Sequence, residues 1–177
     1  LQGSWPHRPL LGPGSAFAPL PALPTLFRGD AQGLEAAVRR HLEHFNAHPY
    51  LANLALGAVL RLEADGEGPD AVRRFKTAVR GPLGGLGDAL VWGAWLPAVS
   101  LAALILLWLG APAWAAVLCF LVAYNAGHVG LRAWAFMTGL TQGRGVGRSL
   151  GAAALGAWTE RVRTVAGFLL GLFCGAV

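Results

Sequence analysis

Three histidines, His41, His44 and His48, are separated by three and four residues within the segment AVRRHLEHFNAHPY. On a continuous helix these spacings place the imidazoles on one face, where they could act as zinc ligands. The order HLEH, however, matches neither HExxH nor HxxEH, the two helical metalloprotease patterns. A polar strip that faces a sugar or a protein partner is therefore favoured over a metal site, and an ordinary helix surface is the remaining alternative.

A glycine-rich run, GPLGGLGD at residues 81–88, precedes a long apolar stretch. Backbone N–H groups in such runs can cradle phosphate, but this run lacks both the GK[ST] end of a P-loop and the GxGxxG dinucleotide pattern. Its last residue, Asp88, would also repel a phosphate. A carboxylate at the edge of a membrane segment is costly and tends to mark a pathway or binding site, but Asp88 equally suits the N-cap of the next helix. The two interpretations are compatible, and both stay open.

Side chains suited to sugars occur elsewhere in the chain. Asn46 and Gln2 offer both a donor and an acceptor to hydroxyl groups, and Trp5 can stack on the apolar side of a sugar ring. No Ser/His/Asp set or carboxylate pair indicates hydrolysis, and Cys119 and Cys174 lie in apolar runs without a CxxC spacing. These residues predict sugar binding, with no catalytic residue, no metal and no cofactor of the chain's own.

The composition indicates that membrane helices position these residues. Of the 177 residues, 55% are hydrophobic and only 13% are charged, and the 43 residues between Asp88 and Arg132 include no Asp, Glu, Lys or Arg. A crossing takes ~20 apolar residues, so this block accommodates two, at roughly 89–109 and 113–131, joined by a turn at 110–112. A soluble core helix rarely runs half that length unbroken.

The segments before the apolar block predict shorter helices. Residues 1–30 are rich in proline and suit an interfacial segment. Residues 33–63 predict an amphipathic helix, a bend at NAHP, and an apolar piece that is too short to cross and is therefore re-entrant or interfacial. AVRRFKTAVR (71–80) predicts a basic helix that ends at the glycine-rich run.

The whole pattern predicts one all-α polytopic membrane domain over residues 1–177, with N-terminal amphipathic or re-entrant helices and about three membrane-embedded helical segments. Within it, residues 81–131 form a glycine-rich turn plus two crossings, and residues 132–177 form a glycine-rich segment and a last helix.

The net charge of +5 and the pI near 10.2 arise from basic residues that flank the apolar block, in Arg61 to Arg80 and in Arg132 to Arg163. Lys and Arg behave in this way when they hold loops on the cytoplasmic side of a membrane. No RNA- or DNA-binding signature accompanies them, so we expect no nucleic acid partner and take anionic lipid headgroups as the partner of these charges.

Several segments resemble one protein family, in its order and at its spacing. They are LQGSW at the start, AVRRHLEHFNAHPY at 37–50, GPLGGLGDALVWGAWLPAV at 81–99 and YNAGHVGLRAWAFMTGLTQG at 124–143. These segments resemble the IID proteins of the mannose–fructose–sorbose family of bacterial sugar phosphotransferase systems, over most of the chain.

The resemblance implies a membrane subunit of a sugar transporter. IID proteins pair with a IIC protein of similar architecture, form a trimer of heterodimers in the bacterial inner membrane, and move a core domain relative to a scaffold. Soluble IIA/IIB proteins, phosphorylated on histidine from phosphoenolpyruvate, hand the phosphate to the incoming hexose-type sugar. IID itself carries no phosphorylated residue, so the three histidines above are not expected to be phosphohistidines.

Matched by motif, the residues that the resemblance places on the substrate side are Gln2 and Trp5 of QGSW, Asn46 and His48 of FNAHP, and Asp88. Family members generally extend further at both ends and carry Pro or Ser where Ala89 stands, so the sequence indicates a shortened homologue. The alternative function is therefore a truncated, non-transporting paralogue that acts as a membrane scaffold or regulator of the phosphotransfer partners.

Overall fold

All the regular secondary structure in the described part of the chain is helical. The computed structural model describes residue 14, residues 18–151 and residues 154–176, and every regular element in these ranges is a helix. In chain order the helices are α2 (Leu23–Leu26), α3 (Ala31–Leu42), α4 (Ala52–Ala64), α5 (Pro69–Gly87), the π-helix η1 (Asp88–Trp95), α6 (Leu96–Trp108), α7 (Ala113–Gln142), the 3₁₀ turn η2 (Gly143–Gly145), α8 (Val146–Gly151) and α9 (Ala154–Ala176). The predicted all-α class is confirmed.

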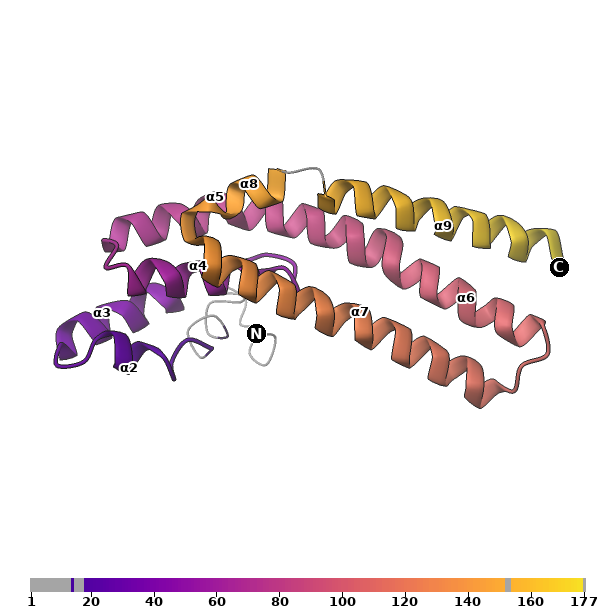
Figure 1. Ribbon diagram of the computed structural model, residues 1–177, viewed down its shortest axis with the longest axis horizontal. Helices are drawn as coiled ribbons and strands as arrows, with labels where there is room; N and C mark the ends of the chain where they lie inside the picture. The colour runs from indigo at the N-terminus through magenta and orange to yellow at the C-terminus, as the bar shows by residue number, and fades with distance from the viewer. Residues whose placement is uncertain (1–13, 15–17, 152–153, 177) are drawn as a thin grey trace.

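Helices α5, η1 and α6 follow one another without a break and form a rod along the length of the molecule (Figure 1). Helix α7 returns antiparallel to the rod on one side, and α9 runs along its other side in the same direction as the rod (Figure 1). Helices α2, α3 and α4 gather around the end of the molecule where α5 begins (Figure 1). This end holds most of the buried side chains.

Helices stand where the two crossings were expected, and whether they cross a membrane stays a prediction. The first consists of η1 and α6, and Gly110, at φ +89°, lies in the turn that leads to the second. The second, α7, is longer than predicted because the glycine-rich segment continues the helix until Gly143, at φ +52°. By length and composition, Pro69–Trp108 and Ala113–Arg148 qualify as candidate membrane spans.

The exposed surface of α7 is apolar along most of its length. In the apolar 18-residue stretch that qualifies this helix as a candidate span, only 6% is buried inside the molecule. The large hydrophobic side chains that it exposes include Trp114, Val117, Leu118, Leu121, Val122 and Val129. A soluble monomer rarely exposes so large a contiguous apolar surface, so a bilayer or a membrane partner is the environment that suits this helix.

Helix α3 is shorter than the histidine spacing suggested. The side chain of Asp30 caps its start by accepting a 2.8 Å hydrogen bond from the backbone N–H of Gly33, but the helix ends at Leu42 and Glu43 is extended. The expectation that His41, His44 and His48 share one helix face is therefore wrong. The backbone leaves the helix so that Phe45 can enter the core, where it is 3% exposed.

The glycine-rich run does not end the basic helix, contrary to the prediction. Helix α5 continues through residues 81–87, with Pro82 inside it, and passes directly into η1. Tertiary packing overrides the weak helix propensity here, because the side chain of Leu83 is fully buried against the core and Gly87 is buried beneath His48.

Helix α4, the apolar piece too short to cross a bilayer, packs along α7 and is largely buried. Two glycines make this packing possible. A Cβ atom on Gly57 would lie 2.2 Å from the carbonyl oxygen of Phe136, and one on Gly139 would lie 2.1 Å from that of Leu54. The two backbones are therefore in direct contact, as at small-residue crossings of membrane helices.

Candidate functional site

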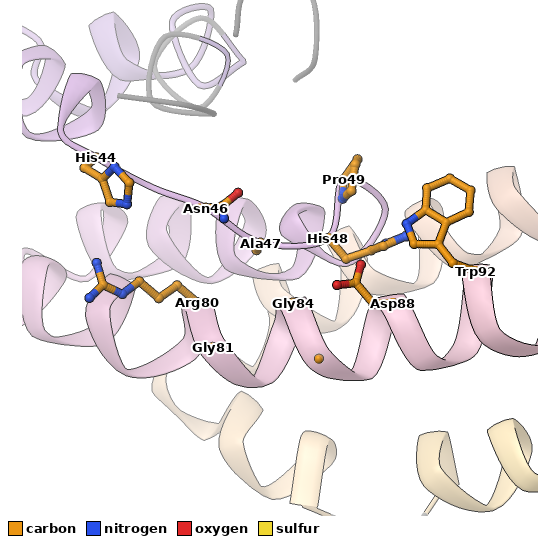
Figure 2. A pocket seen from close by; sticks show the side chains of 11 residues that line it. His44, Asn46, Ala47, His48, Pro49, Arg80, Gly81, Gly84, Asp88 and Trp92 are labelled. Carbon is orange, nitrogen blue, oxygen red and sulfur yellow. The ribbon is translucent and has the colours of Figure 1, made fainter. Parts of the chain in front are cut away.

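The nonhelical residues between α3 and α4, here called the 43–51 segment, lie along the face of α5 and η1 and enclose a cavity of about 590 Å³ with them (Figure 2). The residues that line the cavity are His44, Asn46, Ala47, His48, Pro49, Arg80, Gly81, Gly84, Gly85, Asp88 and Trp92. The volume is in the range of pockets that hold small ligands.

The rod supplies its half of the lining from one helical face. Positions 80–81, 84–85, 88 and 92 recur at the spacing of successive helical turns. A Cβ atom added to Gly81, Gly84 or Gly85 would meet no other atom within 4 Å. The absence of side chains on this face leaves the cavity open. The run does not form a phosphate loop, because it lies inside α5, where the helix itself uses the backbone N–H groups.

Asp88 points into this cavity from the rod (Figure 2). It does not cap the N-terminus of a crossing helix, because its own backbone is helical (φ −63°, ψ −45°) and its N–H bonds the carbonyls of Gly84 and Gly85. Of the two interpretations left open for this residue, the capping role is wrong. Its exposed carboxylate is available to a ligand in the cavity.

His48 forms the wall between the 43–51 segment and the rod. It is 2% exposed, and its Nδ1 accepts a 3.3 Å hydrogen bond from the backbone N–H of Tyr50, so the proton of the neutral ring lies on Nε2. Burial lowers the pKa of His48 below its ordinary value of 6.5; the charge of Asp88 opposes this shift and that of Arg132 adds to it. His48 is therefore neutral at neutral pH.

Buried contacts of Arg40 and an exposed ion pair of Glu43 hold the start of the 43–51 segment in place. At the end of α3, Arg40 donates from Nε to Oε1 of Glu63 on α4 at 2.7 Å and from Nη2 to Oε2, and His41 Nε2 lies 3.3 Å from the same carboxylate. Lys76 on α5 donates a 2.7 Å hydrogen bond to the carbonyl of Arg40. Arg73 on α5 also pairs with Glu43 at 2.8 Å. The segment is thus fixed to two helices before it reaches the cavity.

The structure brings together three of the five predicted substrate residues. Asn46, His48 and Asp88 come from separate parts of the chain and line the same cavity (Figure 2). Gln2 and Trp5 lie outside the described residues. Nothing in the described residues tests whether any of the three binds a sugar, so that assignment stays a prediction.

Sequence reasoning missed Trp92 and Arg80 as cavity residues. Trp92 is 45% exposed, and its ring centroid lies 5.3 Å from that of His48. Both residues could have been found by extending the helix through the glycine-rich run, because they stand one turn after and two turns before Asp88. Because the glycine-rich run was interpreted as the end of the helix, the shared helical face of Arg80, Asp88 and Trp92 was not recognised.

Comparisons with known proteins agree with the resemblance. A family model described as "PTS system mannose/fructose/sorbose family IID component" matches residues 1–177. The mannose-specific EIID component of Escherichia coli strain K12 is 29% identical over 176 residues, which are 97% of this chain and 62% of the relative. The sorbose-specific EIID component of Lacticaseibacillus casei is 30% identical over 142 residues, or 77% of this chain and 50% of the relative.

The fold also matches a solved membrane transporter. The cryo-EM structure of the mannose transporter ManYZ in complex with microcin E492 contains a chain with a TM-score of 0.74 and 28% identity, covering 97% of this chain and 64% of that one. The all-helical architecture and the long apolar helices are thus those of a chain found in a membrane transporter complex. The chain belongs to the IID-component family of mannose-type phosphotransferase systems, and it spans about 62% of the length of its Escherichia coli relative.

Proposed function

We propose that this chain binds a hexose-type sugar in the cavity between the 43–51 segment and the rod, and that it translocates the sugar as part of a phosphoenolpyruvate-dependent phosphotransferase system. The observation that carries the proposal is the convergence of Asn46, His48 and Asp88 on one cavity. The names of the relatives support the class of substrate, since they are mannose- and sorbose-specific components.

The cavity offers the chemical groups that a sugar needs. The carboxylate of Asp88 can accept hydrogen bonds from two hydroxyl groups, and the exposed amide of Asn46 can both donate and accept. The partly exposed ring of Trp92 supplies the stacking surface that the sequence led us to expect from Trp5. These groups suit a polyhydroxylated ligand, and we assign the transfer of phosphate to a soluble partner protein.

Uptake measurements test the site. In cells that coexpress the chain with a IIC subunit, we expect Asp88→Asn and Asn46→Ala each to reduce sugar uptake about tenfold or more, because each removes a hydrogen bond to a desolvated hydroxyl. Asp65→Asn and Asn125→Ala serve as matched controls on exposed residues outside the cavity. Wild-type uptake by both cavity variants, at equal amounts in the membrane, would remove these residues from the site.

Filling the cavity provides an independent test. Gly84→Leu places a side chain where no atom lies within 4 Å, so it should abolish uptake while the protein still inserts and assembles. Gly167→Leu, on an exposed face of α9 with equally open space, is the control and should transport normally. Normal transport by Gly84→Leu would place the sugar elsewhere.

We further propose a multi-pass subunit of the bacterial inner membrane that forms a trimer of heterodimers with IIC and receives phosphate through soluble IIA/IIB proteins. Its support is the likeness to a chain of the ManYZ mannose transporter and the apolar outer face of α7. Coexpression with a IIC protein, followed by detergent extraction and pull-down, should give a stoichiometric complex. The scaffold or regulator alternative, which predicts insertion without a IIC partner, is not favoured, because the matched relatives are named as transport-system components.

A further inference from the structure

Behind the cavity wall, one face of α7 carries three side chains that the proposed site does not use. Tyr124, His128 and Arg132 recur every four residues. All three contact Tyr50, the residue two places after His48. The Tyr50 hydroxyl lies 2.7 Å from that of Tyr124, the ring centroid of Tyr50 lies 4.5 Å from that of His128, and the guanidinium carbon of Arg132 lies 4.8 Å from the Tyr50 centroid.

Arg132 is the one charged residue in the sequence of α7. A charge within a membrane helix is costly and is kept where it has a specific partner or a function. Its Nε is buried and has no hydrogen-bond partner among the described residues. The face of the Tyr50 ring is therefore the contact that the structure provides for this cation, and such a cation–π contact strengthens when water is excluded.

Tyr50 contacts His48, the residue of the cavity wall, in two ways. Its backbone N–H donates the hydrogen bond that fixes Nδ1 of His48, and the edge of one ring meets the face of the other, with the centroids 5.0 Å apart. His48 in turn lies against the backbone of the rod, since a Cβ atom on Gly87 would be 2.2 Å from that of His48. The position of Tyr50 thus determines the position of His48, and His48 determines the distance between the 43–51 segment and the rod.

We propose that Arg132 is a positioning residue for the sugar site: stacked on Tyr50, it holds Tyr50 against α7, and through Tyr50 it holds His48 in the cavity wall. Arg132 does not touch the sugar. The inference rests on the proposed function, because it takes the cavity that His48 lines as the place where sugar binds.

The test is a kinetic comparison in the coexpressed IIC–IID complex. Arg132→Gln removes the cation from the Tyr50 ring and should raise the half-saturating sugar concentration roughly three- to thirtyfold, with a smaller change in the maximal rate. Arg132→Lys keeps a cation over the ring and should stay within about threefold of the wild type. Arg74→Gln, an exposed arginine on α5, is the matched control with no expected effect.

A double-mutant cycle shows whether Arg132 acts through the wall. In a His48→Ala background, Arg132→Gln should add little to the loss of affinity, because the residue that it positions is gone. Tyr124→Phe, which removes only one hydroxyl from Tyr50's contacts, should show a milder rise that is likewise lost in the His48→Ala background. Fully additive effects, or a loss of maximal rate without any change in half-saturation, would overturn the proposal.

The two proposals fail in different ways. If Asp88→Asn and Asn46→Ala transport normally, the cavity is not the sugar site and the proposed function fails first. If those variants lose uptake while Arg132→Gln has the half-saturating concentration of the wild type, the site stands and the positioning role of Arg132 is wrong. Membrane amount and IIC pull-down, measured for every variant, separate both outcomes from misfolding.

Discussion

Glu63 is the most heavily paired carboxylate of the described residues. Its side chain is 1% exposed, and its carboxylate contacts Arg40 and His41 of α3. Lys76 of α5 donates a hydrogen bond to the backbone carbonyl of Arg40 close by. Burial alone would raise the pKa of Glu63, but the contacts with His41 and Arg40 outweigh it, and the pKa lies below the ordinary 4.5. The carboxylate therefore stays ionised where it joins two helices.

Removing this charge should destabilise the polar end of the molecule. Glu63→Gln leaves the buried guanidinium of Arg40 without its counter-charge, which typically costs about 3–5 kcal/mol. We expect a clearly lower melting temperature of the detergent-solubilised protein by intrinsic tryptophan fluorescence. Glu35→Gln, which breaks the exposed Arg39–Glu35 pair on the same helix as Arg40, should leave it unchanged.

The same residue gives a pH dependence of defined sign. Because the folded-state pKa of Glu63 is depressed, its contribution to stability is fully present above the unfolded value of 4.5 and is lost as the pH falls through the folded value. The melting temperature of the wild type should therefore fall below pH 4.5 more steeply than that of Glu63→Gln. Parallel curves for the two proteins would contradict this assignment.

At the residue scale, the sequence predicted which side chains matter better than it predicted where they lie. Asn46, His48 and Asp88 were selected by their chemistry and by motif, and all three reach one cavity. Their convergence could not follow from periodicity, since it depends on how the 43–51 segment folds back on the rod. The contact between Tyr50 and Arg132 joins residues 82 positions apart in the sequence, beyond the reach of any local pattern.

At the scale of the helices, the contact between α4 and α7 requires glycine at two positions. Gly57 and Gly139 face the opposite backbone at distances that leave no room for a methyl group. Between them α4 and α7 fix the position of Tyr50, which precedes α4 and lies against α7. A change in the separation of these helices would therefore also displace the cavity wall.

Adding one methyl group should have opposite effects at two glycines. Gly57→Ala pushes its Cβ into the backbone of α7 and should destabilise the protein by about 2–3 kcal/mol, because backbone cannot yield as a side chain does. Gly130→Ala, within α7 but with no atom near its Cβ position, should be neutral or stabilise by up to about 1 kcal/mol. Thermal unfolding in detergent compares the two; equal melting temperatures would mean that the helices separate without cost.

Local patterns predicted the existence of the helices but not where α3 and α5 end. The place of the two long apolar helices and the bend at NAHP were correctly predicted, although α7 continues beyond the predicted end of the second crossing. Both errors have one cause: glycine, proline and histidine patterns describe local preference, whereas the burial of Phe45 and Leu83 decides where the backbone goes. The sequence carries no local sign of that burial.

For the molecule as a whole, the charges gather at one end. The loop after α4 and the turn after α7 meet there, and Arg144 pairs with Glu67 across them. The opposite end, at residues 109–112, has no charged residue in its sequence. An arginine-rich end is retained on the cytoplasmic side, so the proposed multi-pass arrangement places the 109–112 turn outside.

Cysteine labelling in intact cells checks this orientation. In a background of Cys119→Ser and Cys174→Ser, Leu109→Cys should react with a membrane-impermeant maleimide, since Leu109 is 67% exposed. Ala64→Cys, exposed at the arginine-rich end, should react only after permeabilisation. The reverse pattern would invert the proposed orientation, and reaction at both positions in intact cells would contradict a crossing between them.

The uninterrupted rod connects the proposed sugar cavity to the proposed first crossing, and so to the thickness of the bilayer. Gly84, Asp88 and Trp92 belong to the same helix that continues as the first crossing, so any tilt of the crossing tilts one wall of the cavity with it. A crossing adjusts to thinner or thicker membranes chiefly by tilting. The length of the lipid acyl chains should therefore affect the shape of the cavity. We expect the cavity to differ in shape between short-chain and long-chain lipids.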